Sequence, residues 1–322
     1  MKINAVQEQF PLARPFTISR GTRTHQDVVT VTINDGKTSA KGECTPYPRY
    51  GESIESVIKQ VHSLNSLPDG VELNRETLQQ LLPAGAARNA VDCALWRLEL
   101  QQEFPYQAFD IEPEIVTAMT VSLDSPEKMA QQAKELCKQG ARLLKIKLNN
   151  EQIIERVNAV RTVAPGAELI IDANEAWGEI DLENIFNQLS PFHIRMIEQP
   201  VPKGQDAQLL SIKHPITLCA DESCHTTDDL DELIGCYEMI NIKLDKAGGL
   251  TEALKLEAKA HQLGFKVMVG CMVGSSLAME TALPIASKAD LVDLDGPLLL
   301  KKDRVNGLLY RQGAIQLNGV TA

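Results

Sequence analysis

The chain has 322 residues, of which 43% are hydrophobic and 23% are charged, and 43 Asp+Glu against 32 Lys+Arg give it a net charge of −11. This composition excludes a disordered tail, a small disulfide scaffold and a collagen-like fibre, and the length suits about two domains of ~150 residues or one large α/β barrel beside a smaller domain. The acidic balance argues against a nucleic acid as the main partner, because nucleic-acid binding draws its affinity from concentrated Lys and Arg.

The first residues contain no apolar segment of the signal-peptide kind, and no run of ~18 apolar residues occurs, so we expect neither secretion nor a membrane span. Seven cysteines are scattered without a C-x-x-C motif, which is typical of reduced thiols in a bacterial-type cytosol. The six histidines form no HExxH pair and therefore give no zinc signal. We expect a cytoplasmic protein.

The N-terminal third of the chain mixes strand and helix patterns. Residues 28–33 are β-branched, and Asn34-Asp35-Gly36 is a hairpin signal that precedes a return toward residues 42–44. From Ser53 the pattern becomes helical, and residues 84–100 form a long apolar-periodic helix. We expect residues 1–113 to form an α+β domain.

Beyond Pro113, short apolar runs alternate with amphipathic segments. The predicted strands are residues 115–121, 143–148, 169–172, 194–198, 217–220, 239–243, 266–270 and 291–294. The predicted helices are residues 126–139, 153–163, 182–189, 205–212, 230–234, 250–263 and 277–287. Such short strand–helix units demand parallel neighbours, and eight strands close into a barrel over residues 114–296 with its active site at the carboxyl ends of the strands. We expect the turn-rich residues 297–322 to pack back onto the N-terminal part.

Polar residues close these strands at nearly the barrel period. They are Lys147, Asp172, Glu198, Asp221, Lys243 and Asp293, and the gaps among the first five are 25, 26, 23 and 22 residues. Asp172, Glu198 and Asp221 come from three consecutive strands and should converge at the mouth, where they cannot all stay ionised without a cation. Hard oxygen ligands in an incomplete shell favour Mg²⁺. The alternative for each is an ordinary strand-end acid, an N-cap or a salt-bridge partner.

Three lysines should face the same site. Lys145 and Lys147 point to one face of their strand, since alternate residues do, and Lys243 ends a strand half a barrel turn away. Lys147 and Lys243 would approach a substrate from opposite sides, which suits removal of a proton from one face and its return to the other. We expect Lys145 and the metal to lower their pKa toward the working pH. Lys246, in the following loop, is expected to be solvated.

Asp293 and Asp295 share one face at the end of the last strand. They could hold a cationic group of a substrate, such as an ammonium. The other interpretation is that they only cap the turn at Gly296-Pro297.

Together these motifs resemble a known group of enzymes. The set comprises Lys145-x-Lys147, Asp172-Ala173-Asn174, Glu198-Gln199-Pro200, Asp221-Glu222-Ser223, Asn241-Ile242-Lys243 and Asp293-x-Asp295. It resembles the muconate-lactonizing subgroup of the enolase superfamily, and within it the dipeptide epimerases. The resemblance covers essentially the whole chain, including residues 42–46 and 83–89 of the N-terminal region.

The resemblance implies an α/β protein with a modified TIM-type (β/α)7β barrel under an α+β capping domain. It implies one Mg²⁺ ion on Asp172, Glu198 and Asp221, with Lys147 and Lys243 as the acid/base pair and Lys145 assisting. Asp293 and Asp295 would match the pair that grips a dipeptide's free ammonium. A cap loop selects the side chain in this family, and here Arg20 or Arg23 of residues 19–23 could bind a glutamate γ-carboxylate; Tyr47, Arg49 and Tyr50 could line a second cap loop.

The implied activity is Mg²⁺-dependent epimerisation of Ala-Glu dipeptides by 1,1-proton transfer at the Glu α-carbon, in the metabolism of murein peptides. The enzymatic alternatives are an o-succinylbenzoate synthase or a cycloisomerase with the same Lys/Mg site, or a dipeptide epimerase of different side-chain specificity. Asp293 and Asp295 speak against the first two, because a dianionic substrate gains nothing from further carboxylates. Acid-sugar dehydratases usually need a histidine, and strand seven ends in Gly270-Cys271. A barrel kept only as a binding protein is the alternative from another class.

Overall fold

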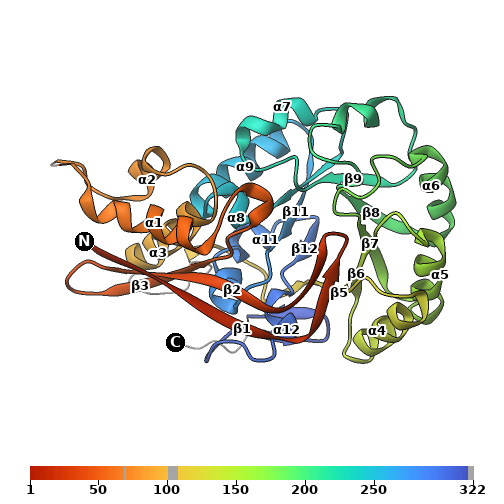
Figure 1. Cartoon of the computed structure of the whole chain (residues 1–322), viewed down its shortest axis with the longest axis horizontal. Helices are drawn as coiled ribbons and strands as arrows, with labels where there is room; N and C mark the ends of the chain where they lie inside the picture. The colour runs from red at the N-terminus through yellow and green to blue at the C-terminus, as the bar shows by residue number, and fades with distance from the viewer. Residues whose placement is uncertain (69, 101–107, 318–322) are drawn as a thin grey trace.

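A computed structural model describes residues 1–68, 70–100 and 108–317 of the chain. A capping region of antiparallel strands and helices lies beside an eight-stranded parallel barrel (Figure 1). The predicted α/β class, with a modified barrel and an α+β cap, is confirmed. Residues 69, 101–107 and 318–322, which belong to the predicted cap and C-terminal segment, lie outside the described residues.

The capping sheet consists of three antiparallel strands in the order β1-β2-β3. Their bounds are Lys2–Ile18, Gly21–Asn34 and Ser39–Cys44. The sequence pattern did not predict β1, since Pro11 and Pro15 interrupt it and the pairing with β2 shifts register between Pro11 and Phe16. The β1–β2 hairpin is long, and its tip curls over the front of the barrel (Figure 1).

Helices α1 (Ile54–Ser63) and α3 (Ala86–Glu99) pack against this sheet, and α2 (Arg75–Leu81) packs against α3. Short 3-10 turns lie at Pro48–Tyr50 and Leu64–Ser66. The Ser53 side chain caps α1 by accepting from Ser56 N, which explains why the helical pattern begins there. Strand β3 packs directly on α3, because a Cβ at Gly42 would lie 2.1 Å from the carbonyl oxygen of Ala90.

The barrel strands follow one another in chain order from β5 to β12, as the strand–helix rhythm predicts. They are β5 (Ala118–Val121), β6 (Leu143–Lys147), β7 (Glu168–Asp172), β8 (Ile194–Glu198), β9 (Thr217–Ala220), β10 (Met239–Ile242), β11 (Lys266–Gly270) and β12 (Leu291–Asp293). Side chains join the first strand to the last: Leu294 N donates to Thr117 Oγ1 over 2.8 Å, and Thr120 N donates to Asp295 Oδ2 over 2.7 Å.

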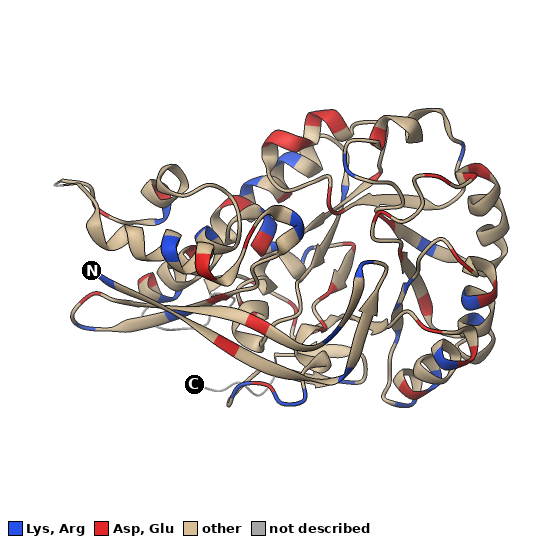
Figure 2. Ribbon diagram, viewed as in Figure 1, with Lys and Arg blue, Asp and Glu red and all other residues tan. Residues whose placement is uncertain are grey.

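The helices around the barrel are α4 (Pro126–Lys138), α5 (Ile153–Val163), α6 (Leu182–Leu189), α7 (Leu230–Leu233), α8 (Leu244–Ala247), α9 (Leu250–Gln262), α10 (Ser276–Glu280) and α11 (Leu283–Ala286). Further 3-10 turns lie at Ser190–Phe192, Asp206–Ser211 and Thr227–Asp229. Among the helices of the described residues, none combines the length and apolar character needed to cross a bilayer. Acidic and basic residues both occur along the outer helices (Figure 2).

Three predicted elements differ from the structure. The expected strand at 115–121 is two strands, because β4 (Glu114–Val116) pairs with the C-terminal segment and only β5 enters the barrel. The segment 205–212 is a 3-10 turn rather than an α-helix. The expected helix at 277–287 is broken between α10 and α11, where Pro284 near the start of α11 cannot donate to the preceding turn.

The C-terminal segment contains α12 (Gly296–Leu299), β13 (Leu309–Arg311) and β14 (Ala314–Gln316). Strand β14 lies between β13 and β4 in a small antiparallel sheet. Arg304 of this segment donates to Glu8 in β1 and to buried Glu43 in β3. The C-terminal segment therefore contacts both the cap and β4, the strand that comes just before the barrel.

A polar contact ties the cap to the barrel behind β10. Asp245 Oδ1 accepts from Thr45 N and from Asn89 Nδ2, each over 2.9 Å. Arg88 of α3 donates to the carbonyl oxygens of Ala247 and Gly248. These contacts place the cap loop that follows β3 next to the strand end that carries Lys243.

Candidate active site

The carboxyl ends of the parallel strands meet at one rim of the barrel, and the predicted polar residues gather there. These buried residues are Lys145 and Lys147 of β6, Asp172 of β7, Glu198 of β8, Asp221 after β9, Lys243 after β10, Asp293 of β12 and Asp295 just after it. The structure thus brings together every barrel residue that the sequence assigned to the site.

Lys145 lies at the centre of the acidic residues. Its Nζ is 3.0 Å from Asp172 Oδ2, 2.7 Å from Glu198 Oε2 and 2.8 Å from Asp293 Oδ2. The contact with Glu198 Oε2 is an ion pair without hydrogen-bond geometry, so this oxygen makes no hydrogen bond. The carboxylates of three different strands therefore share one ammonium.

Lys147 and Lys243 stand on two sides of this acidic group. Lys147 Nζ donates to Asp172 Oδ2 over 2.6 Å, and Lys243 Nζ donates to Asp221 Oδ2 over 2.6 Å. Their strands, β6 and β10, are four positions apart in the barrel. Both lysines nevertheless line the same cavity of about 70 Å³.

Burial and neighbouring charges move the pKa values of the three carboxyl groups in different directions. Burial and the charge of Asp172 raise the pKa of Glu198 to about 7. Burial also opposes ionisation of Asp172 and Asp221, but lysine charges outweigh it and hold the pKa of both carboxyls below the usual range. The lysine charges therefore stabilise the ionised forms of Asp172 and Asp221 well and that of Glu198 poorly.

Lys145 alone does not lower the pKa of Lys243 below its ordinary value in this arrangement, and the expected lowering with a metal bound stays a prediction. Burial lowers the pKa of Lys243, but Asp221 and Glu198 outweigh burial and raise it well above its ordinary value, while Lys145 contributes only a smaller lowering effect. The pKa of Lys145 is likewise lowered by burial but raised further by its carboxylate partners. A cation shared by the same carboxylates would weaken this hold on the lysine protons.

Asp293 and Asp295 differ in their partners although they share a strand end. Asp293 Oδ2 accepts from Lys145, whereas its Oδ1 makes no hydrogen bond. Asp295 accepts from Thr120 N, and burial together with the charge of Asp293 raises its pKa to about 7. The buried Asp293 Oδ1 is thus an acceptor without a donor.

Lys246 contradicts the sequence-based expectation of a solvated side chain. It is fully buried, and its Nζ donates to Asp221 Oδ1, to the Asp221 carbonyl and to the carbonyls of Cys224 and Asn241. The loop containing it is the helical turn α8, which directs this side chain inward.

Other residues of the motifs support the charged groups, and sequence reasoning gave them no role. Asn241 Nδ2 donates to Glu198 Oε1 over 2.9 Å, and Gln199 Oε1 accepts from the backbone N of Asp221 over 2.8 Å. Asn174 Oδ1 accepts from Lys147 Nζ over 3.4 Å. Each of the three lies one or two positions from a predicted site residue in the sequence. This proximity is the signal that could have identified them.

The two arginines of the cap loop have different environments. Arg20 donates to Glu222 Oε1 over 2.8 Å, to Glu175 Oε2 over 3.1 Å and to the Asn174 carbonyl over 3.0 Å. Arg23 donates only its Nη1 to Gln26 over 3.1 Å among the hydrogen bonds of the described residues, and its guanidinium lies 5.8 Å from the Tyr47 ring centre. The N–H groups of Arg20 therefore bind other protein groups, whereas Arg23 has N–H groups that remain able to bind a ligand.

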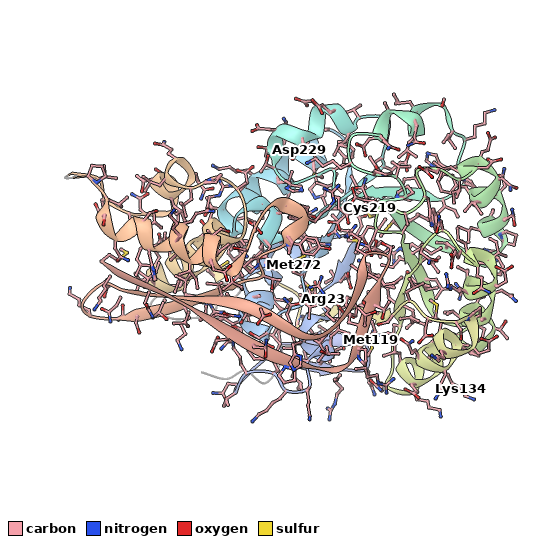
Figure 3. The ribbon with its side chains drawn as sticks, in the orientation of Figure 1. Arg23, Met119, Lys134, Cys219, Asp229 and Met272 are labelled. Carbon is pink, nitrogen blue, oxygen red and sulfur yellow. The ribbon has the colours of Figure 1, made fainter. Side chains whose placement is uncertain are left out.

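Cap and barrel residues enclose the cavity together. Arg23 from the hairpin and Met272 from the loop after β11 both line it, and Figure 3 labels these two side chains at the front of the barrel. Tyr47 and Tyr50 of the second cap loop also line it, whereas Arg49 pairs with Glu175. The cap thus supplies the part of the cavity wall that the barrel lacks.

The donor set fits a hard divalent cation. In the described part of the chain, no three or more His, Cys, Asp and Glu side chains are arranged as a metal site as they stand, because Lys145 lies between Asp172 and Glu198. The three carboxylates are nevertheless buried on consecutive strands, and Glu198 Oε2 lacks a hydrogen bond. Buried carboxylate oxygens short of positive charge are the ligands that Mg²⁺ prefers.

Comparison with known proteins identifies relatives along the whole chain. Residues 1–103 match the mandelate racemase/muconate lactonizing enzyme N-terminal domain, and residues 128–317 match the enolase C-terminal domain-like family. L-Ala-D/L-Glu epimerase of Escherichia coli is 45% identical over 98% of this chain and 99% of its own length. N-acetyl-D-glutamate racemase of Pseudoalteromonas sp is also 45% identical, over 89% of this chain and 91% of its own.

Solved structures of related enzymes also match this chain over nearly its whole length. A crystal structure of an enolase family member from Agrobacterium tumefaciens, with homology to dipeptide epimerases and with bound sodium and L-Ala-L-Glu, is 48% identical. It superposes with a TM-score of 0.92 over 98% of this chain and 97% of its own. The substrate-liganded L-Ala-D/L-Glu epimerase from Bacillus subtilis is 30% identical, with a TM-score of 0.91 over 98% and 95% of the two chains.

Proposed function

The chain belongs to the mandelate racemase/muconate lactonizing enzyme family of the enolase superfamily, and we propose that it is a dipeptide epimerase that interconverts L-Ala-D-Glu and L-Ala-L-Glu. As an enzyme it is an isomerase of the racemase and epimerase kind. One observation carries the proposal: Lys147 and Lys243, from strands half a barrel apart, line one cavity beside the acidic residues.

In the proposed reaction the two lysines exchange a proton with opposite faces of the Glu α-carbon. One lysine removes the proton from one face, and the other returns a proton to the opposite face, which inverts the centre. Lys145 assists through its ion pairs with Asp172 and Glu198. Mg²⁺ held by Asp172, Glu198 and Asp221 would supply the positive charge that stabilises a deprotonated carboxylic substrate.

We assign the two ends of the substrate to different groups of the site. We propose that Arg23 binds the γ-carboxylate, since its guanidinium lines the cavity and has donors to spare, whereas Arg20 is held by Glu222 and Glu175. Asp293 and Asp295 would hold the free ammonium, which supplies the donor that Asp293 Oδ1 lacks.

Proton NMR in D₂O with Mg²⁺ tests the function directly. Wild-type protein should convert either dipeptide into a mixture of both and replace the Glu α-proton with deuterium. If the two dipeptides neither interconvert nor exchange that proton, the proposed function is wrong.

Racemisation of an N-acylated glutamate is a second candidate. The relative from Pseudoalteromonas is as similar as the epimerase from Escherichia coli. The pKa of Asp295 near 7 also weakens the negative charge offered to an ammonium, and a protonated carboxyl can donate to an acyl oxygen instead.

Parallel assays distinguish the two candidates. N-acetyl-D-glutamate and L-Ala-D-Glu are compared with wild type and with Asp293→Asn. For a dipeptide epimerase, the kcat/KM for L-Ala-D-Glu should exceed that for the acetylated substrate, and the variant should lower the first much more than the second. The reverse order would favour the racemase.

We further propose that residues 1–113 and 297–322 act as the cap and residues 114–296 as the catalytic barrel, a division supported by the contacts of Arg304 with Glu8 and Glu43. The seven free cysteines support a cytoplasmic location. Turnover of murein peptides, which contain D-Glu, is the physiological role that we propose.

A further inference from the structure

Asp221 is held by two lysines of the same helical turn. Lys243 is the N-cap of α8, and the backbone N of Lys246 donates to the Lys243 carbonyl over 3.0 Å. Residues three apart on a helix lie on one side of it, so both ammonium groups reach the same carboxylate. Lys243 Nζ lies 2.6 Å from Asp221 Oδ2, and Lys246 Nζ lies 2.6 Å from Asp221 Oδ1.

The two lysines nevertheless differ in what else they contact. Lys243 lines the 70 Å³ cavity with Lys147, whereas Lys246 lines a different cavity of about 330 Å³. The Lys246 side chain is 0% exposed, and its three N–H groups face four acceptors. It therefore has no proton donor left for a substrate.

The acceptors of Lys246 fix the segment that carries Asp221. They include the carbonyls of Asp221 and Cys224, at 2.5 and 2.7 Å, and the carbonyl of Asn241 at 2.9 Å. One ammonium thus joins both ends of the loop after β9 to the end of β10. The same ammonium also orients the Asp221 carboxylate, because it binds Oδ1 while Oδ2 accepts from Lys243.

We propose that Lys246 is a positioning residue for the metal site: it locks the Asp221 carboxylate in place, so that Asp221 keeps its orientation when Lys243 releases it. This inference rests on the proposed function, in which Asp221 is a metal ligand and Lys243 transfers protons. Partners that orient a ligand from outside the coordination shell typically account for ~10–100-fold in metal affinity.

The test is the affinity of the purified protein for Mn²⁺, followed by EPR titration, in wild type, Lys246→Met and Lys259→Met. Lys259 is a matched control, because it also donates to a carbonyl, that of Thr227, and pairs with Asp231 rather than with Asp221. We expect Lys246→Met to weaken Mn²⁺ binding by ~10–100-fold, with far-UV circular dichroism unchanged, and Lys259→Met to bind as wild type does. A folded Lys246→Met protein with wild-type Mn²⁺ affinity would overturn the proposal.

If Lys246→Met does not fold, a second variant, Lys246→Arg, tests the proposal instead. It keeps the positive charge, but its planar guanidinium cannot donate to the same four acceptors. A folded Arg variant should bind Mn²⁺ at least ~5-fold more weakly, within the range for such partners, and wild-type affinity would overturn the proposal. Failure of the proposed function is seen separately, as wild-type protein that binds Mn²⁺ but leaves both Ala-Glu dipeptides unchanged.

Discussion

Arg20 Nη2 lies 2.8 Å from Glu222 Oε1, and this ion pair fastens the tip of the β1–β2 hairpin to the loop that follows β9. Glu222 is almost completely buried, and burial together with the charge of Asp221 raises its pKa, while Lys243 and its ion-pair partner Arg20 oppose that rise. The cavity beneath has about 70 Å³ and lies between the cap and the barrel rim. Because the hairpin tip lies over this cavity, we expect it to move when a dipeptide enters.

Arg20→Met should loosen this closure. The variant leaves Glu222 buried without its ion-pair partner, and we expect a loss of about 1–3 kcal/mol in the free energy of unfolding and a higher KM for every dipeptide. Urea unfolding and steady-state kinetics with L-Ala-L-Glu and L-Ala-L-Ala measure both effects. An unequal loss for the two substrates would contradict a role in closure alone.

Arg23→Met should change selectivity instead. A charge-assisted bidentate contact with the γ-carboxylate is worth roughly 1.5–3 kcal/mol, or about 10–150-fold in kcat/KM. We expect this loss for L-Ala-L-Glu and little change for L-Ala-L-Ala. Arg20→Met is the matched control, and an equal loss for both dipeptides in Arg23→Met would refute the assignment.

Replacement of either lysine should separate the two half-reactions. Lys147→Met and Lys243→Met each remove one of the two proton-transfer groups, so epimerisation should fall by ~10²–10⁴-fold. Each variant should still exchange the α-proton of one epimer with D₂O, and the retained epimer should differ between the variants. NMR of both dipeptides checks this, and exchange of the same epimer by both variants would contradict a two-sided site.

Because of Asp245, the free energy of unfolding should fall as the pH rises from about 4 to about 7. Burial raises its pKa to about 7, whereas an unfolded Asp titrates near ~3.9. Between these values the folded chain holds a proton that the unfolded chain has lost, so the contribution is present below pH ~4 and is lost by pH ~7. Asp245→Asn keeps the acceptor for Thr45 and Asn89 without titrating.

Urea unfolding from pH 4.5 to 7.5 measures this contribution. The wild type should lose stability relative to Asp245→Asn across the window, by at most ~4 kcal/mol. Parallel curves for the two proteins would show that Asp245 keeps an ordinary pKa.

Chelation of the metal should abolish epimerisation and lower the thermal midpoint. A ligand at 100 times its Kd stabilises the folded state by about 2.7 kcal/mol, and EDTA removes that contribution. Differential scanning fluorimetry with and without Mg²⁺ measures the shift. Asp221→Asn, which weakens a proposed ligand, should shrink the difference between the two conditions, and an undiminished difference would place the metal elsewhere.

The sequence by itself determined the barrel and most of its rim. Hydrophobic periodicity places β6 to β12 within about a residue, and polar residues at their ends recur at the barrel period, so Lys147, Asp172, Glu198, Asp221 and Lys243 could be read as one site. This works because strand ends of a parallel barrel converge whatever the loops do.

The tertiary structure alone decided the groups whose role depends on a partner distant in sequence. Lys246 has the sequence context of a solvated loop lysine, and only the approach of the Asp221–Cys224 loop buries it. Arg20 and Arg23 are equivalent in the sequence, and Glu222, about 200 residues away, distinguishes them. Periodicity reports which face of an element is apolar, but the pairing of two charges depends on long-range packing that no local pattern encodes.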